Sequence, residues 1–163
     1  ARLHGPIGLH IGSHTPAVLH MLRACGIVYA RPTGAVAHFG PPPDFMEWTP
    51  TCHHKANLAE RWSAFRAQTR PDKLFYLWGH SYEFDDDRNW ELIEQFAAEA
   101  GAEPGLWHAT NGQIYDYISA WRALHVSVEM TAFRNAGCVP LWFRVNRELH
   151  GLAPGAVLCV PPA

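Results

Sequence analysis

The chain has 163 residues, of which 48% are hydrophobic and 12% aromatic, a composition that excludes a disordered polypeptide and suits one globular domain. Its 13 basic and 15 acidic residues are mixed along the sequence and give a formal charge of -2. No basic stripe is present to neutralise phosphates, so we do not expect nucleic acid as a partner.

Cysteine spacing and hydropathy predict a soluble protein with reduced thiols. The cysteines stand far apart without a C-x-x-C pair, which predicts neither a zinc ribbon nor a dense disulfide framework. No apolar run approaches the length of about 18 residues that a membrane helix needs, and the first residues show no signal-peptide pattern. We expect a cytoplasmic location and no membrane partner.

The first predicted elements are a helix, a strand and a long loop. Thr15 suits an N-cap, Pro16 the first helical position and Gly26 the residue that stops the helix. Residues 27–30 predict a short strand, and the Pro- and Gly-rich residues 31–43 predict an irregular loop. Loops of this length in compact domains are often functional.

A second helix and a buried strand are predicted next. Residues 55–68 show a helical apolar face, and Pro71 prevents the helix from continuing. The run Leu74–Trp78 is apolar without alternation, which is typical of a strand covered on both faces in a parallel sheet. The predicted helical face consists of Leu58, Trp62 and Phe65.

Alternation of strands and helices continues to about residue 124. The acidic run Asp85–Asp87 suits the start of a helix that ends at Gly101. Residues 106–109 predict a strand, and Asn111 can cap a further helix. The pattern predicts an α/β fold.

The last part of the chain predicts antiparallel β structure. Three short strands are expected over residues 126–133, 139–145 and 156–160, separated by Gly-containing turns. We therefore predict a first domain over residues 1–124 and a small β element over residues 125–163 packed on it.

Histidine is abundant, with 11 residues, and serves both as metal ligand and as acid or base near neutral pH. His10, His14 and His20 are spaced by four and six residues, which does not match common zinc motifs, and Pro16 interrupts the helical face between them. We expect structural roles for this group.

His53 and His54 follow Cys52 and form a second candidate. Adjacent side chains point apart in a strand, so at most one of these histidines could share a metal site with the cysteine. Loop packing is the alternative role for both.

His80 is the preferred candidate for a catalytic residue. It follows the predicted buried strand and Gly79, a residue that allows another group to approach closely. In α/β folds, ligands bind at the carboxyl ends of parallel strands. The alternative is a structural histidine that caps the following segment or bonds to Glu83.

Long composite motifs at these positions give the chain a family resemblance. F-Y-L-W-G-H-S-Y-E-F-D at residues 75–85, followed by N-W-E-L-I-E, L-W-H-A-T-N and I-Y-D-Y, resembles the C-terminal portion of the NodB-like polysaccharide deacetylases, in a bacterial subgroup. G-I-V-Y-A-R at residues 26–31 and P-D-F-M-E-W-T-P-T-C-H-H at residues 43–54 fit the same subgroup in the same order. The similarity covers about residues 8 to 145.

This resemblance implies a distorted (β/α) barrel, of which the chain forms a partial barrel followed by the small β element. It also implies a metal-dependent deacetylase that hydrolyses N-acetyl groups on carbohydrate, with zinc or a similar divalent ion as cofactor. N-acetylated carbohydrate is the implied partner.

The family's metal ligands, one Asp and two His, lie in motifs that this chain does not match. Its first third has no Asp-Asp pair before a helix, and residues 11–15 imitate the histidine motif with Val18 where the second His falls. By register, residues 9–14 correspond to a later Tyr-Pro-Phe-Gly-like motif, with His10 where Pro is usual. We therefore expect no metal on this chain alone.

By the same resemblance, His80 matches the late histidine that acts as general acid. An alternative function is a catalytically inactive fragment or a carbohydrate-binding remnant. An open partial barrel also exposes strand edges, so self-association through them is expected. The residues expected to line the substrate groove are Trp48, His53, His54, Trp78, Tyr82 and Glu83.

Overall fold

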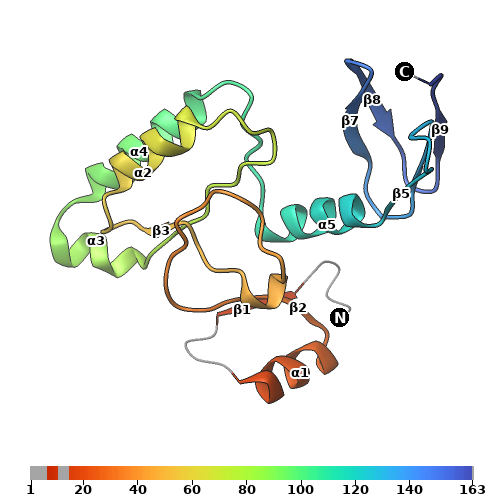
Figure 1. Cartoon of the computed structure of the whole chain (residues 1–163). Coiled ribbons are helices and arrows are strands. Elements are labelled where there is room, and N and C mark those ends of the chain that lie inside the picture. Colours follow the sequence, from red (N-terminus) through yellow and green to blue (C-terminus); the bar gives the residue numbers. More distant parts are fainter. Residues whose placement is uncertain (1–6, 11–14, 163) are drawn as a thin grey trace. The chain divides into compact units, whose positions relative to one another are not determined.

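The computed structural model describes residues 7–10 and 15–162, which form a mixed α/β fold of helices and small sheets (Figure 1). The helices are α1 (Pro16–Ala24), the short 3₁₀ helix η1 (Phe45–Glu47), α2 (Leu58–Ala67), α3 (Ser81–Asp87), α4 (Trp90–Ala102) and α5 (Asn111–Arg122). The strands are β1 (Ile7–His10), β2 (Ile27–Arg31), β3 (Cys52–His53), β4 (Leu77–Trp78), β5 (Leu124–Val126), β6 (Ala132–Asn135), β7 (Leu141–Val145), β8 (Glu148–Leu152) and β9 (Val157–Cys159).

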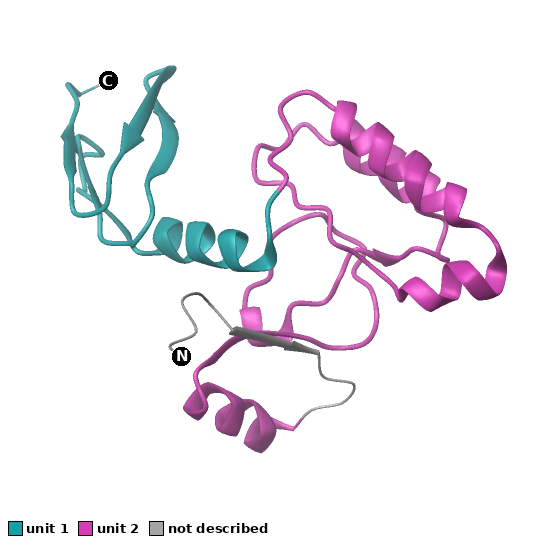
Figure 2. Ribbon diagram, turned by 180° about the vertical axis from the view of Figure 1, so that it is seen from behind, with its two compact units in different colours: residues 1–6, 109–163 teal, residues 7–108 magenta. Residues whose placement is uncertain are grey.

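The chain divides into two compact units (Figure 2). Residues 7–108 form the first, here called the N-terminal unit, and the residues from 109 onward form the C-terminal unit. Helix α5 is thus grouped with the strands that follow it, although the sequence pattern places a domain boundary after residue 124. The described strands form no closed barrel.

Two parallel strand pairs organise the N-terminal unit. Strand β1 pairs with β2, and β3 pairs with β4 in the register Cys52↔Leu77 and His53↔Trp78. A helix connects the strands of each pair, so β1–α1–β2 and β3–α2–β4 are both βαβ units. Each unit brings the carboxyl ends of its two strands to one edge.

Helix α1 forms as the sequence predicts. The Thr15 side chain accepts a hydrogen bond from the backbone N–H of Val18, and Pro16 occupies the first turn. Gly26 lies just past the end with φ +81°, a left-handed conformation that favours glycine. The strand predicted over residues 27–30 is confirmed as β2.

Helix α2 buries its predicted face, and Trp62 and Phe65 of this face belong to an aromatic cluster. Its buried side chains contact rings from the preceding loop, from the segment before β4 and from α4, which runs beside α2 (Figure 1). Edge-to-face pairs such as Trp62 with Phe96, whose ring centroids are 5.3 Å apart, fix the packing. The cluster consists of Phe39, Trp62 and Phe65, with Phe75, Phe96, Ala100 and Leu106 packed against it.

Three predictions for the N-terminal unit are wrong in whole or in part, although the helix predicted after the acidic run does form, as α4. Of the predicted strand, only Leu77 and Trp78 form a strand, β4, and both are half-buried instead of covered on both faces. The run Asp85–Asp87 ends α3 and does not start a helix, because α3 already begins after His80 and ends at Arg88, where φ is +52°. Residues 106–109 form no strand, since no described strand pairs with them.

The C-terminal unit is antiparallel, as predicted. Strands β5, β6 and β9 form one sheet and β7 and β8 a hairpin. The hairpin turns at Asn146 and Arg147, which both have positive φ, and this makes β8 a strand that the predicted pattern lacks. Residues 127–131 turn between β5 and β6, so the predicted strand over 126–133 is split. Thr110, not Asn111, caps α5.

A buried amide holds the C-terminal unit together. The Asn135 side chain is fully buried and donates to the carbonyl oxygens of Val139 and Leu152, both at 2.9 Å. Its Oδ1 accepts from the backbone N–H of Gly137, also at 2.9 Å. A Cβ on Gly137 would lie 2.3 Å from the Cβ of Ala120, so glycine is needed where this turn meets α5.

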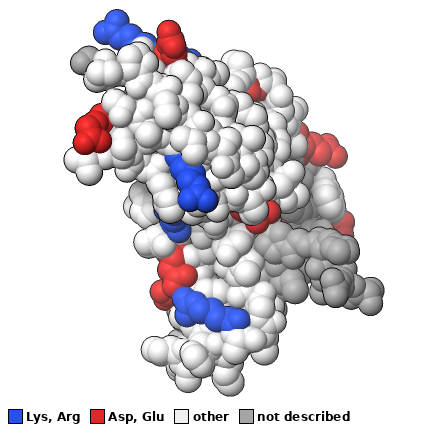
Figure 3. Space-filling model, turned by 90° about the vertical axis from the view of Figure 1, so that its right-hand side faces the viewer, with Lys and Arg blue, Asp and Glu red and all other residues white. Residues whose placement is uncertain are grey.

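The charged side chains are distributed as the balanced composition predicts. Among the described residues drawn in Figure 3, acidic and basic side chains lie scattered on uncharged surface, without a continuous stripe of either sign. None of the described helices combines the length and the apolar character that crossing a membrane requires.

The four free cysteines predict a simple thiol-reactivity pattern. Cys52 is buried, and this burial raises its pKa despite the opposing charge of Arg61, whereas Cys25, Cys138 and Cys159 are exposed. We expect a thiol reagent to modify the exposed cysteines at least about tenfold faster than Cys52 in the native chain. Mass spectrometry of the labelled protein measures this, with denatured chain as the control in which all four react alike. Equal native rates would contradict the packing around β3.

Candidate functional site

Three histidines and one glutamate meet at the carboxyl ends of β3 and β4. His53 ends β3 and pairs in register with Trp78, which ends β4. The chain then continues into His80 and α3, which carries Glu83. We call His53, His54, His80 and Glu83 the histidine cluster.

One carboxylate oxygen organises this cluster. Glu83 Oε2 accepts from the backbone N–H of His80 at 2.8 Å and lies 3.2 Å from His80 Nδ1. It also lies 3.1 Å from His53 Nε2. His53 Nδ1 accepts from the backbone N–H of Lys55 at 3.2 Å, so in the neutral ring Nε2 carries the proton and donates it to Glu83.

Glu83 remains a carboxylate in this environment. Partial burial raises its pKa, but the hydrogen bonds from His80 and the charges of His53 and His54 outweigh burial, and the net pKa is lowered. Lys55 Nζ lies 3.8 Å from Glu83 Oε1 and 2.6 Å from Asp87 Oδ2, so its charge is paired mainly with Asp87.

The His54 side chain is buried away from solvent. It is 2% exposed, and neither ring nitrogen has a partner among the described residues. Its Nδ1 lies 3.8 Å from Glu83 Oε2, and the ring packs on Phe84 and His53 with centroids 4.3 Å away in each case. Burial, reinforced by the charge of His53, lowers the pKa of His54, so the ring is neutral near pH 7.

Gly79 makes room for that ring. An ideal Cβ at this position would lie 2.0 Å from His54 Nδ1, so no side chain fits while His54 keeps its place. The prediction that this glycine allows a close approach is confirmed. The group that approaches is a second histidine of the cluster.

Aromatic rings flank the cluster. The His80 ring stacks on Tyr82 at 5.2 Å between centroids, and Trp78 meets His53 edge to face at 4.4 Å. Tyr82 is 58% exposed and the His80 side chain 43%, so this side of the cluster faces solvent. Rings of this kind are suited to stacking against sugars.

Two cationic residues at the site escaped the sequence prediction. The Arg31 guanidinium lies over the Trp78 ring at 4.2 Å from its centroid. Arg31 ends β2, so the carboxyl ends of β2, β3 and β4 converge here. The only sequence signal was that Arg31 closes the Gly26–Arg31 motif; for Lys55 we find no signal beyond its place next to His54.

Trp48 does not belong to the cluster. It is buried and packs its ring against Tyr29, Phe45 and Tyr76 with centroids 4.9 to 5.8 Å away. Its backbone N–H donates to Ala30 O. In this structure it is a core residue and offers no surface to a substrate. His54, being buried, offers none either.

One group of described side chains has donor atoms close enough to share a metal ion. Donor atoms of His53, His80 and Glu83 all lie within 4.8 Å of one another. Cys52 is not part of this group. The candidate cluster of His10, His14 and His20 involves side chains outside the described residues.

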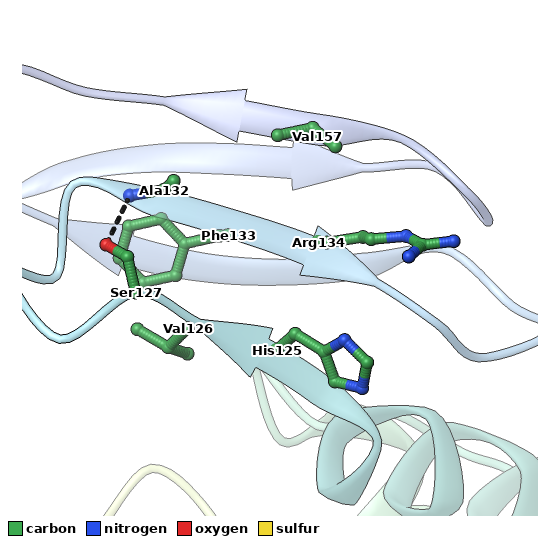
Figure 4. Close-up of a pocket in the computed structure, with 7 residues that line it drawn as sticks. All are labelled: His125, Val126, Ser127, Ala132, Phe133, Arg134 and Val157. Atoms are coloured by element: carbon green, nitrogen blue, oxygen red, sulfur yellow. Dashed lines mark hydrogen bonds between the residues drawn. The ribbon is translucent and has the colours of Figure 1, made fainter.

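A hollow of about 280 Å³ lies on the sheet of the C-terminal unit (Figure 4). The Ser127 hydroxyl accepts from the backbone N–H of Ala132 at its edge. Most of the lining is apolar, and it brings no acid and base together. The lining residues are His125, Val126, Ser127, Ala132, Phe133, Arg134 and Val157.

Comparison of the chain with models of protein families, with curated proteins and with solved structures finds no match. A function for the chain is therefore inferred from its motifs and from the geometry of the histidine cluster.

Adding a methyl group at Gly79 tests the packing of His54. We expect Gly79→Ala to lower the free energy of unfolding by about 1–3 kcal/mol, the usual cost of overpacking, because the added Cβ would clash with His54, whose ring already packs on Phe84 and His53. Urea unfolding measures the change. Gly101→Ala is the matched control: it lies in α4 with no atom near the added Cβ, and it should be neutral or stabilising by about 0.5–1 kcal/mol. Equal stability of both variants would contradict the His54 placement.

The neutral His54 also predicts a pH dependence of stability. Its folded pKa lies below the unfolded value of about 6.5, so below that pH the unfolded chain binds more protons and the free energy of unfolding falls. The lowered pKa of Glu83 acts in the same direction but only below about pH 4.3.

We therefore expect stability to fall from pH 7 to pH 5, and to fall less in His54→Phe, which keeps a ring but cannot titrate. Urea unfolding at each pH, with a chelator present, measures both slopes. Replacement of the exposed His20 by Gln is the control and should leave the slope unchanged. An unaltered slope in His54→Phe would show that another group causes the dependence.

Proposed function

We propose that this chain carries the general acid of a metal-dependent deacetylase that hydrolyses N-acetyl groups on carbohydrate, and that His80 is that acid. The observation that carries the proposal is the place of His80 within the W-G-H-S-Y-E-F motif: it follows the end of β4 and its ring is held by Glu83. This is the position at which α/β folds present catalytic groups.

The two parallel strand pairs are the basis for the proposed architecture. We propose a partial (β/α) barrel, because β1–α1–β2 and β3–α2–β4 are two consecutive βαβ units. The carboxyl ends of β2, β3 and β4 carry Arg31, His53 and Trp78, which lie around one place. In barrels of this type such an edge carries the active site.

His80 is arranged to deliver a proton. Its Nδ1 faces the Glu83 carboxylate, so Nε2 is left to carry the transferable proton. When an N-acetyl group is hydrolysed, water gives one proton to a general base, which by the resemblance is an Asp in motifs that this chain does not match, and its oxygen adds to the carbonyl carbon. The C–N bond then breaks. The departing sugar nitrogen takes the proton from His80 Nε2, and acetate is the second product. Glu83 acts as a positioning residue, and its negative charge stabilises the protonated ring.

The rings around the acid form the proposed contact surface for sugar, with Tyr82 exposed and Trp78 and His53 partly buried. Tyr82 and Trp78 flank the acid, and His53 completes the wall on the other side of Glu83. We propose these residues as the substrate contacts. Trp48 and His54 are left out, because both are buried in the described structure.

The family's metal does not fit the residues assigned here. The family holds its ion with one Asp and two His in motifs that this chain does not match, whereas the group that the described residues bring together is two His and one Glu. In that group His80 and Glu83 already act as acid and positioning residue. No step of the deacetylation is therefore routed through a metal on this chain.

The proposal is tested by acetate release from an N-acetylated chito-oligosaccharide, in a protein that contains this chain together with the family's metal-binding motifs. His80→Ala and His80→Gln should each lower kcat by about 10²- to 10⁴-fold, because neither side chain can protonate the leaving amine. His108→Ala, which alters an exposed histidine of the same unit outside the cluster, should keep the wild-type rate.

Two results would reject the proposal. An unchanged rate in His80→Ala makes His80 a structural histidine. Oligosaccharide binding without acetate release by the wild-type protein favours the carbohydrate-binding alternative.

A further inference from the structure

We infer that His53, His80 and Glu83 form a binding site for one divalent transition-metal ion, with zinc as the best match to the donor set. Two imidazole nitrogens and one carboxylate oxygen are ligands that zinc accepts in open sites, where water occupies the remaining position. The site is separate from the Asp-His-His arrangement implied by the resemblance, and it does not require the chain to be a deacetylase.

The distances fit a shared ion. Zinc bonds of about 2.0–2.1 Å in tetrahedral geometry place ligand atoms about 3.3–3.5 Å apart. Glu83 Oε2 lies 3.1 Å from His53 Nε2 and 3.2 Å from His80 Nδ1, so these two pairs need to open by a few tenths of an ångström, and the donor atoms of His53 and His80 lie within 4.8 Å of each other. Sequence spacing could not reveal this set, because His53 comes from β3 and the other two ligands from the start of α3.

His54 provides a second observation that points to a ligand. A buried polar ring that finds no hydrogen-bond partner in the described part of the chain needs an explanation, and its Nδ1 lies 3.8 Å from the same carboxylate oxygen. Water coordinated to a cation at Glu83 would give this neutral nitrogen a hydrogen-bond partner, which it lacks among the described residues. His54 is not in the ligand group itself.

Two contacts oppose the ion and limit its affinity. Metal at His53 Nε2 displaces the proton there, and the ring must then carry its proton on Nδ1 and give up the hydrogen bond from the Lys55 amide. The Lys55 ammonium is also near, although Asp87 at 2.6 Å largely neutralises it. We therefore expect reversible binding that a strong chelator removes.

Access to the ion is open on one side. The His80 side chain is 43% exposed, whereas those of His53 and Glu83 are 19% and 16% exposed. An ion can therefore enter past His80 and retain water there. If the proposed function holds, metal on His80 Nδ1 also prevents His80 from acting as the general acid, because a metal-bound imidazole is neutral and does not carry the second proton. This consequence alone rests on the deacetylase proposal.

The test is direct metal binding by the full chain after chelator treatment. We expect Co²⁺ to give visible absorption bands at one equivalent, without the strong near-ultraviolet bands of thiolate ligands, and Zn²⁺ to displace it. His53→Gln and Glu83→Gln should each weaken metal affinity at least about tenfold. Loss of a residue that only hydrogen-bonds to a ligand already costs about this much, and loss of a ligand should cost no less. His20→Gln, outside the cluster, should bind as wild type.

Circular dichroism of the metal-free variants checks that they fold, and His53→Gln is informative even if Glu83→Gln disturbs α3. No binding by the wild-type chain, or one-equivalent binding that a folded His53→Gln variant retains in full, would overturn the site. Because no step of this experiment measures hydrolysis, its failure leaves the deacetylase proposal untouched, and the failure of that proposal leaves the metal site untouched.

Discussion

The arrangement of the N-terminal unit around the histidine cluster depends on the contacts of one carboxylate oxygen, Glu83 Oε2. Glu83 Oε2 receives the His80 backbone N–H and faces rings from both β3 and the start of α3. The same contact therefore starts a helix, orients an exposed histidine and ties two chain segments together. A helix-capping carboxylate usually serves only its own helix, but here it also joins α3 to the end of β3.

Packing around this carboxylate forces different compromises on the three histidines. His80 remains open to solvent, His53 is fixed between Lys55 and Glu83, and His54 is buried without a hydrogen bond. The three histidines thus differ in accessibility and in hydrogen bonding, although they lie around one carboxylate. Function follows from these environments and not from the number of histidines.

Local chemistry made part of this structure predictable. The Thr15 cap, the apolar face of α2 and the contact of His80 with Glu83 depend on residues close in sequence. The prediction that Asp85–Asp87 starts a helix failed, although acidic side chains suit a helix start. The Glu83 side chain, three residues after His80, caps α3, so a helix has already begun before the acidic run. Grouping His53 with His80 required the β3–β4 pairing, a contact between distant segments that residue patterns do not specify.

The absence of a side chain at position 79 has a consequence for the history of such sequences. Because the space that a Cβ would need is filled by the His54 ring, the two positions are not free to diverge separately. A lineage that replaces the histidine by a smaller residue releases the constraint on the glycine, whereas one that keeps the histidine must keep the glycine. Joint variation at these two positions would mark the relatives that retain the buried ring, even where overall similarity has faded.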